Sequence, residues 1–184
     1  MENLDPSEEA MDASRRRGKK IKVPEPLICP FTVCVDNREQ APWHFTGIEG
    51  DSGEIIIVPL LTGQPLATGD YTIAGLEHRL IIERKSPGDF RGSITADRDR
   101  FEREMERMRE VVRAPGGGYA AVVIEASMTD LLTVPESSRV NPVTIARTMQ
   151  SWSIRYGVHF WMLPDRRVAE IWAFRLMQMF WRQQ

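Results

Sequence analysis

The chain has 184 residues, 42% of them hydrophobic and 27% charged, and a net charge of −2 at pH 7. This length allows one domain with its own hydrophobic core but not two domains of ordinary size. The slightly acidic charge excludes a protein that coats nucleic acid non-specifically, and the apolar runs are too short to cross a bilayer. Because the acidic N-terminus is no signal peptide, we expect an intracellular protein.

Residues 1–26 are predicted to form a disordered tail ahead of a domain at residues 27–184. The first half of the tail carries acidic charges only, whereas residues 15–22 are rich in Arg and Lys. Without apolar periodicity the tail cannot bury a core. Its basic half either contacts nucleic acid or is simply solvated.

The cysteines and histidines form no recognisable metal site. Cys29 and Cys34 lack a second pair of ligands for zinc, so we expect reduced thiols. The three histidines are scattered along the chain, and we expect structural or surface roles for them.

The first half of the domain is predicted to consist mostly of strands. Residues 31–36 alternate between apolar and polar side chains, and residues 54–58 form a β-branched strand expected to be buried on both faces or covered by a helix. Residues 61–68 are expected to be a loop. A hairpin is predicted from residues 71–74 and 79–85.

Three side chains after Pro42 are candidates for either packing or nucleic-acid contact. Trp43, His44 and Phe45 are consecutive and lie between two predicted strands. We expect them to pack under the sheet, with base stacking as the less favoured alternative.

The second half of the domain is predicted to alternate helices and strands. Asp89 is the expected N-cap of a short helix over 90–94, and a longer helix with an apolar stripe is expected over 97–113. The remaining predicted elements are a strand at 119–125, a helix from Asn141 to Gly157, a strand at 158–163 and a helix at 165–182. This order predicts an α/β fold, a three-layer α/β/α sandwich around a mixed central sheet.

The final predicted helix is apolar nearly all round. More apolar surface is present on residues 165–182 than one contact with a core buries. The helix is therefore either a partner surface or sandwiched within the domain.

The most informative stretch places a Gly-Asp pair before one strand and Glu-x-Lys on the next. Asp70 and Glu83 supply the oxygen ligands that Mg²⁺ prefers. Because side chains alternate along a strand, Glu83 and Lys85 share a face while Arg84 points to the other. The Lys85 ammonium is then placed to activate a water or to stabilise charge on a phosphoryl group.

Each charged triplet alone is more simply explained as a solvated strand end or a turn. Together they are harder to explain by packing, because each adjoins an apolar run and the spacing pairs adjacent strands. Charge at the rim of a buried sheet usually marks a functional site.

These residues resemble the Gly-Asp/Glu-Arg-Lys-x-x-x-Asp signature of the XPF-type endonuclease family. The signature matches Gly69-Asp70, Glu83-Arg84-Lys85 and Asp89. Three further segments resemble other motifs of that family, and the resemblance spans about residues 32 to 162. The three segments are Val35 to Glu39, Arg98 to Phe101 and Val122 to Glu125.

The resemblance implies a restriction-endonuclease-like fold and a Mg²⁺ or Mn²⁺ site. It implies that Asp36 joins Asp70 and Glu83 as metal ligands and that Arg38 and Glu39 lie nearby. Asp89 is expected to support a metal-bound water or to orient Lys85, and Arg84 to contact phosphate or brace the site. The candidate DNA-binding residues are Arg38, Arg91, Arg98 and Arg100, with the choice between Arg98 and Arg100 left open.

The leading interpretation is a metal-dependent DNA endonuclease acting on branched or flapped DNA in repair, recombination or replication. Its expected partners are DNA and a second copy of the chain, which would dimerise through the nuclease domain and the last helix. Because no helix-hairpin-helix module follows, structure specificity would come from dimerisation, the basic tail or an accessory DNA-binding protein. The alternatives are a catalytically silent DNA-binding or scaffold subunit, and a nuclease of another branch of the fold.

Overall fold

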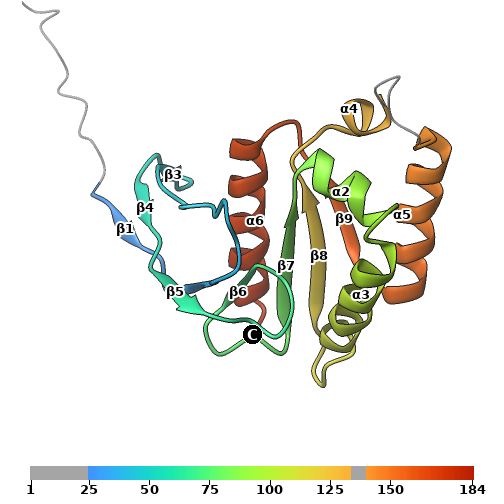
Figure 1. Cartoon of the computed structure of the whole chain (residues 1–184). Helices are drawn as coiled ribbons and strands as arrows, with labels where there is room; N and C mark the ends of the chain where they lie inside the picture. Colours follow the sequence, from blue (N-terminus) through green and yellow to red (C-terminus); the bar gives the residue numbers. More distant parts are fainter. Residues whose placement is uncertain (1–24, 134–139) are drawn as a thin grey trace, which may run out of the picture.

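A six-stranded mixed sheet forms the centre of the fold, seen in a computed structural model that describes residues 25–133 and 140–184 (Figure 1). The order across the sheet is β5-β2-β6-β7-β8-β9. The strands are β2 (Val33–Asp36), β5 (Leu60–Gln64), β6 (Tyr71–Ile73), β7 (Leu80–Lys85), β8 (Tyr119–Ile124) and β9 (His159–Met162). Nearly all of the expected tail lies outside the described residues.

The strand directions bring several strand ends to one edge of the sheet. β6 is antiparallel to both of its neighbours, β2 and β7, whereas β7, β8 and β9 are parallel to one another. The C-terminal ends of β2, β7 and β8 therefore lie at the same edge as the start of β6. Loops at such an edge are where α/β sheets usually bind ligands.

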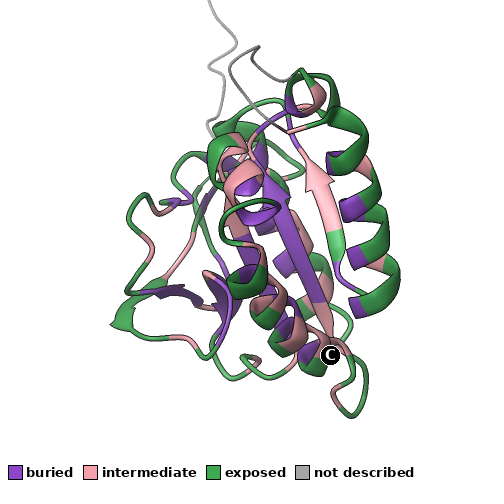
Figure 2. Ribbon diagram, turned by 45° about the vertical axis from the view of Figure 1, so that its right-hand side comes forward, coloured by how far each residue is buried: buried purple, intermediate pink, exposed green. Residues whose placement is uncertain are grey.

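Helices cover both faces of the sheet, so the predicted three-layer α/β/α fold is confirmed (Figure 1). α6 (Arg166–Trp181) packs on one face, and α3 (Arg98–Val112) and α5 (Pro142–Tyr156) pack on the other. The short α2 (Pro87–Ser93) and α4 (Met128–Leu132) lie on the α3 side. Burial is concentrated in the central strands and in the helix faces turned toward them (Figure 2).

The ends of α5 and the start of α6 lie where local chemistry predicts. The Asn141 side chain accepts a hydrogen bond from the Val143 N–H, and Pro142 stands at the first turn, where its missing N–H costs nothing. Gly157 ends α5 with φ +70°, a conformation that suits glycine. Asp165 caps α6 through the Val168 N–H.

The helix after β7 begins earlier than the sequence indicated. Ser86, not Asp89, is the N-cap, because the Ser86 hydroxyl accepts a hydrogen bond from the Asp89 N–H. Pro87 then occupies the first helical turn, where proline is well tolerated. Asp89 lies in that first turn, so its carboxylate is exposed on the helix rather than used as the cap.

Two expectations for the segment between β2 and β6 are wrong. β4 (Ile55–Ile57) belongs to a separate small sheet with β1 (Leu27–Ile28) and β3 (Ile48–Glu49), and Ile57 remains 53% exposed. β5 is an edge strand rather than a loop, paired in parallel with β2.

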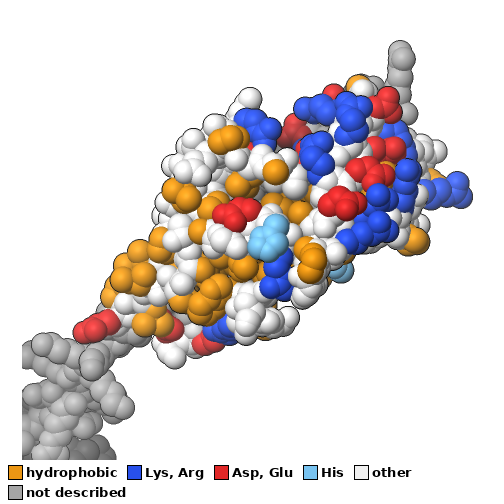
Figure 3. Space-filling view, turned by 90° about the horizontal axis from the view of Figure 1, so that it is seen from below, with side chains coloured by type: hydrophobic (Ala, Val, Ile, Leu, Met, Phe, Trp, Pro, Cys, Tyr) orange, Lys and Arg blue, Asp and Glu red, His pale blue; other side chains and the backbone are white. Residues whose placement is uncertain are grey.

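The small sheet and β5 expose a group of aliphatic side chains. Seen from below, hydrophobic side chains gather near the start of the described chain, whereas Lys and Arg concentrate toward the other end (Figure 3). The exposed aliphatic residues are Leu27, Ile28, Ile55, Ile57, Leu60 and Leu61. Within the described ranges, no helix is long and apolar enough to cross a membrane.

Candidate active site

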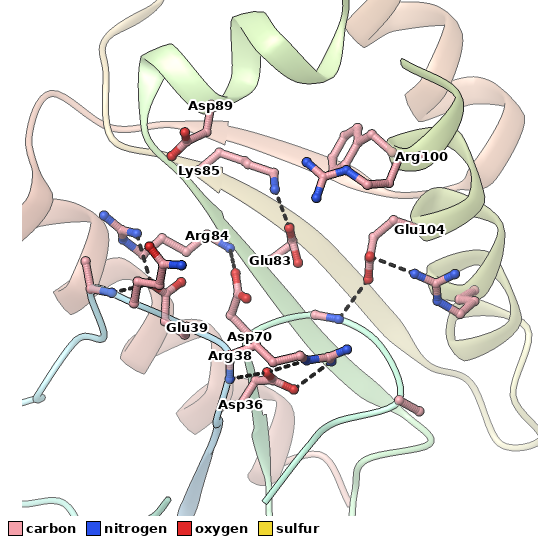
Figure 4. A pocket seen from close by; sticks show the side chains of 16 residues that line it. Asp36, Arg38, Glu39, Asp70, Glu83, Arg84, Lys85, Asp89, Arg100 and Glu104 are labelled. Atoms are coloured by element: carbon pink, nitrogen blue, oxygen red, sulfur yellow. Dashed lines mark hydrogen bonds and ion pairs between the residues drawn. The ribbon is translucent and has the colours of Figure 1, made fainter. Parts of the chain in front are cut away.

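A pocket of about 470 Å³ opens at the sheet edge where β2 and β7 end and β6 begins (Figure 4). α3 forms its opposite wall. Most of its lining is charged, and it brings together every residue of the predicted catalytic set. These are Asp36, Asp70, Glu83, Arg84, Lys85 and Asp89.

Backbone hydrogen bonds bring the first three carboxylates to neighbouring positions on three adjacent strands. The Asp36 N–H donates to the Asp70 carbonyl at 2.8 Å, and the Asp70 N–H donates to the Ile82 carbonyl at 2.9 Å. The Arg84 N–H in turn donates to Asp70 Oδ2 at 2.7 Å. These backbone hydrogen bonds carry Asp70, which lies just before β6, to a position beside Glu83.

Glu83 and Lys85 face the pocket together, as strand alternation predicts. Lys85 Nζ lies 2.6 Å from Glu83 Oε1 and 4.9 Å from the centre of the Phe101 ring. Burial lowers the pKa of Lys85, but the charge and hydrogen bond of Glu83 outweigh burial and leave that pKa raised. Lys85 is therefore a fixed ammonium, suited to stabilising negative charge rather than to accepting a proton.

Asp70 and Glu83 are held in an environment that disfavours two negative charges. Burial, followed by the charge of Glu83, raises the pKa of Asp70 to about 8. Burial also raises the pKa of Glu83, although the neighbouring Lys85 opposes that shift. Two carboxylates that resist ionisation together are stabilised by a cation between them.

Asp36 lies in the pocket, but its oxygens are already engaged. Arg38 donates to both of them at 2.8 Å and its N–H donates to Oδ1 at 2.7 Å, while the Leu66 N–H donates to Oδ2 at 2.6 Å. Burial raises the pKa of Asp36, but these hydrogen bonds outweigh burial and lower it. Asp36 therefore fastens the loops around residues 38 and 66 as an ionised carboxylate.

The predicted three-carboxylate ligand set is not reproduced by the geometry. Across residues 25–133 and 140–184, no three His, Cys, Asp or Glu side chains lie close enough to share one metal ion. Asp70 and Glu83 remain as a pair. Two carboxylates are enough for Mg²⁺, which usually keeps several waters and binds substrate phosphate as well.

Arg84 points to the other side of β7 and braces the site from there, one of its two expected roles. Its guanidinium donates to Glu125 at 2.8 and 2.9 Å and to Glu39 at 3.3 Å, and all three side chains are at least nine-tenths buried. Glu125 also accepts from the Trp43 indole N–H and from Arg166. This network ties β7 and β8 to the loop after β2.

The aromatic segment after Pro42 packs under the sheet, as expected. Trp43 and Phe45 are each 1% exposed, and Trp43 stacks on Tyr71 with ring centres 4.6 Å apart. Glu170 on α6 accepts hydrogen bonds from the N–H groups of His44 and Phe45. Buried in this way, the Trp43 and Phe45 rings offer no face to a base.

The candidate DNA-binding arginines separate into two groups. Arg38 and Arg100 line the pocket, and their side chains are 66% and 72% exposed. Arg98 instead pairs with Glu102 and lies over the Trp152 ring. Arg91 donates to the carbonyls of Asp130, Leu131 and Thr133, so it holds the end of α4 rather than the pocket.

Two charged pocket residues on α3 lie outside the predicted set, which includes only the start of this helix. Glu104 and Arg107 follow Arg100 at spacings of four and seven residues and line the same wall. That spacing puts them on one helical face. The periodicity was therefore available in the sequence, but only the fold reveals that this face meets the loop before Asp70.

A comparison with protein families matches residues 35–173 to the ERCC4 domain. The chain belongs to the ERCC4-domain family. This confirms the resemblance to the XPF-type endonucleases and identifies the chain as a member of a family of DNA nucleases. No curated protein sequence matches the chain.

Solved structures agree on the fold. XPF from Aeropyrum pernix is 21% identical, with a TM-score of 0.57 over 85% of this chain and 61% of that chain. The same protein in complex with DNA gives a TM-score of 0.59 at 21% identity, over 84% of this chain and 66% of that chain. The present chain therefore spans less than two thirds of the length of these relatives.

Proposed function

We propose that this ERCC4-domain protein is a DNA endonuclease that hydrolyses phosphodiester bonds with Mg²⁺ or Mn²⁺, acting on branched or flapped DNA. The observation that supports it most is the pairing of Asp70 and Glu83, two carboxyls of raised pKa, with the Lys85 ammonium in one open pocket. A silent scaffold subunit has no use for such a group, because mutual repulsion costs stability unless a cation is bound.

Asp70 and Glu83 are the residues proposed to hold the divalent cation. Hard oxygen donors at this sheet edge suit Mg²⁺ or Mn²⁺ better than a thiol-binding metal. When bound, such a cation polarises a phosphoryl oxygen and lowers the pKa of water. Asp36 takes a supporting part, since its hydrogen bonds to Arg38 and Leu66 fix the wall opposite α3.

Lys85 is proposed to stabilise the charge that develops during phosphoryl transfer. Its ammonium is held by Glu83 and by the Phe101 ring, so it is preorganised rather than free to follow the substrate. A preorganised cation contributes more to the rate than a mobile one, because it need not reorganise as the charge develops. Asp89, exposed at the start of α2, is proposed to orient a water or Lys85 from the pocket rim.

The DNA strand is proposed to cross the pocket between Arg38 and Arg100. Arg38 follows β2 on one side, and Arg100 lies on α3 on the other, so their guanidinium groups flank Glu83 and Asp70 (Figure 4). Both side chains are exposed, so each guanidinium can bind a phosphate in addition to its present carboxylate partner. Contacts of this kind position the strand without reading its sequence.

Cleavage of labelled oligonucleotides tests this proposal. The purified protein with Mn²⁺ or Mg²⁺ is incubated with flap, fork, duplex and single-stranded DNA of identical sequence. We expect cutting near the junction of the flap or fork, none in EDTA, and none from Asp70→Asn protein that still binds DNA. Cutting that survives either EDTA or Asp70→Asn contradicts the assigned site.

We further propose that two copies associate through α6. Val168, Trp172 and Met179 recur at helical spacing and are 38%, 38% and 51% exposed, which gives α6 an apolar stripe on its outer side. Light scattering after size exclusion should give twice the chain mass for the wild type and the chain mass for Trp172→Arg. A monomeric wild type at high micromolar concentration rejects this interface.

A further inference from the structure

Glu104 on α3 reaches across the pocket to the turn that precedes Asp70. Its Oε1 accepts a hydrogen bond from Thr68 Oγ1 at 2.5 Å. The same oxygen accepts one from the Gly69 N–H at 3.0 Å (Figure 4). Its Oε2 accepts from Arg107 Nη2 at 2.7 Å. Both oxygens of Glu104 are therefore engaged, and two of the three donors belong to the turn.

The same turn is held on its other side by β7. Gly69 has φ +69°, and a Cβ at this position would lie 2.2 Å from Ile81 Cγ2 and 3.2 Å from the Ile82 carbonyl oxygen. The next N–H, that of Asp70, donates to the Ile82 carbonyl. The backbone just before Asp70 is thus clamped between β7 and α3.

We propose that Glu104 is a positioning residue that holds the Thr68–Gly69 turn so that the Asp70 carboxylate faces Glu83. This role rests on the proposed function of the Asp70–Glu83 pair and extends it to a residue on a different element. Charged acceptors make the stronger hydrogen bonds to backbone N–H groups, so an ionised Glu104 is a firm anchor. Residues that orient a metal ligand in this way control how well the metal is bound.

The ion pair of Glu104 on its own helix does not explain its placement. Glu106 makes a comparable pair with Arg109, three residues further on, at 2.7 Å. Its other partner is Arg155 on α5, and it makes no contact with the pocket wall. Glu106→Ala is therefore a matched control, because it removes a surface ion pair of α3 without touching the turn.

The test measures the Mn²⁺ dissociation constant of the DNA-free protein by calorimetry, and the single-turnover cleavage rate at saturating Mn²⁺. For Glu104→Ala we expect the Mn²⁺ dissociation constant to rise and the cleavage rate to fall, each by about 10- to 100-fold. This is the usual effect of losing a residue that orients a metal ligand. Glu104→Gln should show only a small part of these two changes, because its amide oxygen still accepts hydrogen bonds from Thr68 and Gly69. Glu106→Ala should match the wild type.

A double-mutant cycle separates positioning from a general loss of stability. Thr68→Val keeps the shape of the side chain and removes one hydrogen-bond donor, so its effect on Mn²⁺ affinity and cleavage rate should be smaller than that of Glu104→Ala. The double variant should have the same Mn²⁺ affinity and cleavage rate as Glu104→Ala alone. Additive losses, or a Glu104→Gln variant as impaired as Glu104→Ala, would overturn the positioning role. Circular dichroism at the assay temperature verifies that each variant is folded.

The outcome also distinguishes this inference from the proposed function. If the wild type neither binds Mn²⁺ nor cuts DNA, the proposed function fails and the role of Glu104 fails with it. If the wild type does both and Glu104→Ala behaves like Glu106→Ala, only the positioning role is overturned.

Discussion

Replacing Asp70 by asparagine should stabilise the metal-free protein while abolishing its proposed function. The amide has nearly the same shape as the carboxyl and still offers an oxygen to the Arg84 N–H, which donates to Asp70 at 2.7 Å. It removes the charge that burial and Glu83 oppose. The expected gain in stability is therefore a direct measure of the repulsion that a bound cation relieves.

The size of the effect follows from the pKa of Asp70, which rises from 3.8 to about 8 on folding. A shift of about four pKa units corresponds to at most about 6 kcal/mol, at about 1.4 kcal/mol per unit. Glu83 shares this repulsion and Asp70 is partly open to the pocket, so we expect a gain of about 1 to 3 kcal/mol for Asp70→Asn at pH 8. Because the folded-state pKa is raised, the contribution of Asp70 to stability is fully present below about pH 4 and is lost as the pH rises toward about 8.

Urea unfolding in EDTA at several pH values between 5 and 9 measures this difference. The free-energy gap between Asp70→Asn and wild type should widen from pH 5 to pH 8 and then stay constant, whereas the exposed Asp51→Asn should show no gap. Adding Mn²⁺ at about 100 times its dissociation constant should stabilise only the wild type, by about 2.7 kcal/mol. A variant that is less stable at pH 8, or a gap independent of pH, refutes this reasoning.

Three other substitutions test separate parts of the site. Lys85→Met should lower the cleavage rate by at least about 100-fold, because the ammonium acts on the charge that develops during the reaction. DNA affinity, measured by fluorescence anisotropy, should stay within a few-fold of the wild type, and an equal loss of affinity contradicts this role of Lys85. Gly69→Ala should lower the free energy of unfolding in urea by more than about 2 kcal/mol, since its Cβ would meet Ile81 at 2.2 Å in a left-handed conformation. An unchanged free energy of unfolding contradicts the clamped turn. Arg84→Met should lower the free energy of unfolding by about 3 to 5 kcal/mol, because it leaves buried Glu125 without its closest cation. A variant as stable as the wild type would contradict this and show that Arg166 alone neutralises Glu125.

The helical half of the fold was predictable because its signals are local. The cap at Asn141, the positive-φ end at Gly157 and the buried stripe of α5 all depend on residues within a few positions of one another. The small sheet was not predictable in the same way. The β-branched run of β4 looks like a core strand, but its pairing with β1 and β3 and its exposure are set by tertiary context.

The site was predictable to the extent that strand alternation determines it. The shared face of Glu83 and Lys85 and the opposite face of Arg84 follow from period two alone. Whether an acidic side chain is free to bind a metal is not a local property. The engagement of Asp36 by Arg38 and by the distant Leu66 N–H appears only when two loops are brought together.

The pattern of ion pairs indicates where an added cation would gain most. Four of the other carboxylates that line the pocket are already paired with a cation: Asp36 with Arg38, Glu39 with Arg84, Glu83 with Lys85, and Glu104 with Arg107. The fifth, Asp89, is exposed to solvent, where an unpaired charge costs little. Within the part of the chain that the structure describes, Asp70 makes no ion pair, and its one hydrogen-bond donor to the carboxylate is a neutral N–H. Because an unpaired buried charge is the most costly, the proposed cation should bind closest to Asp70, with Glu83 completing its ligands.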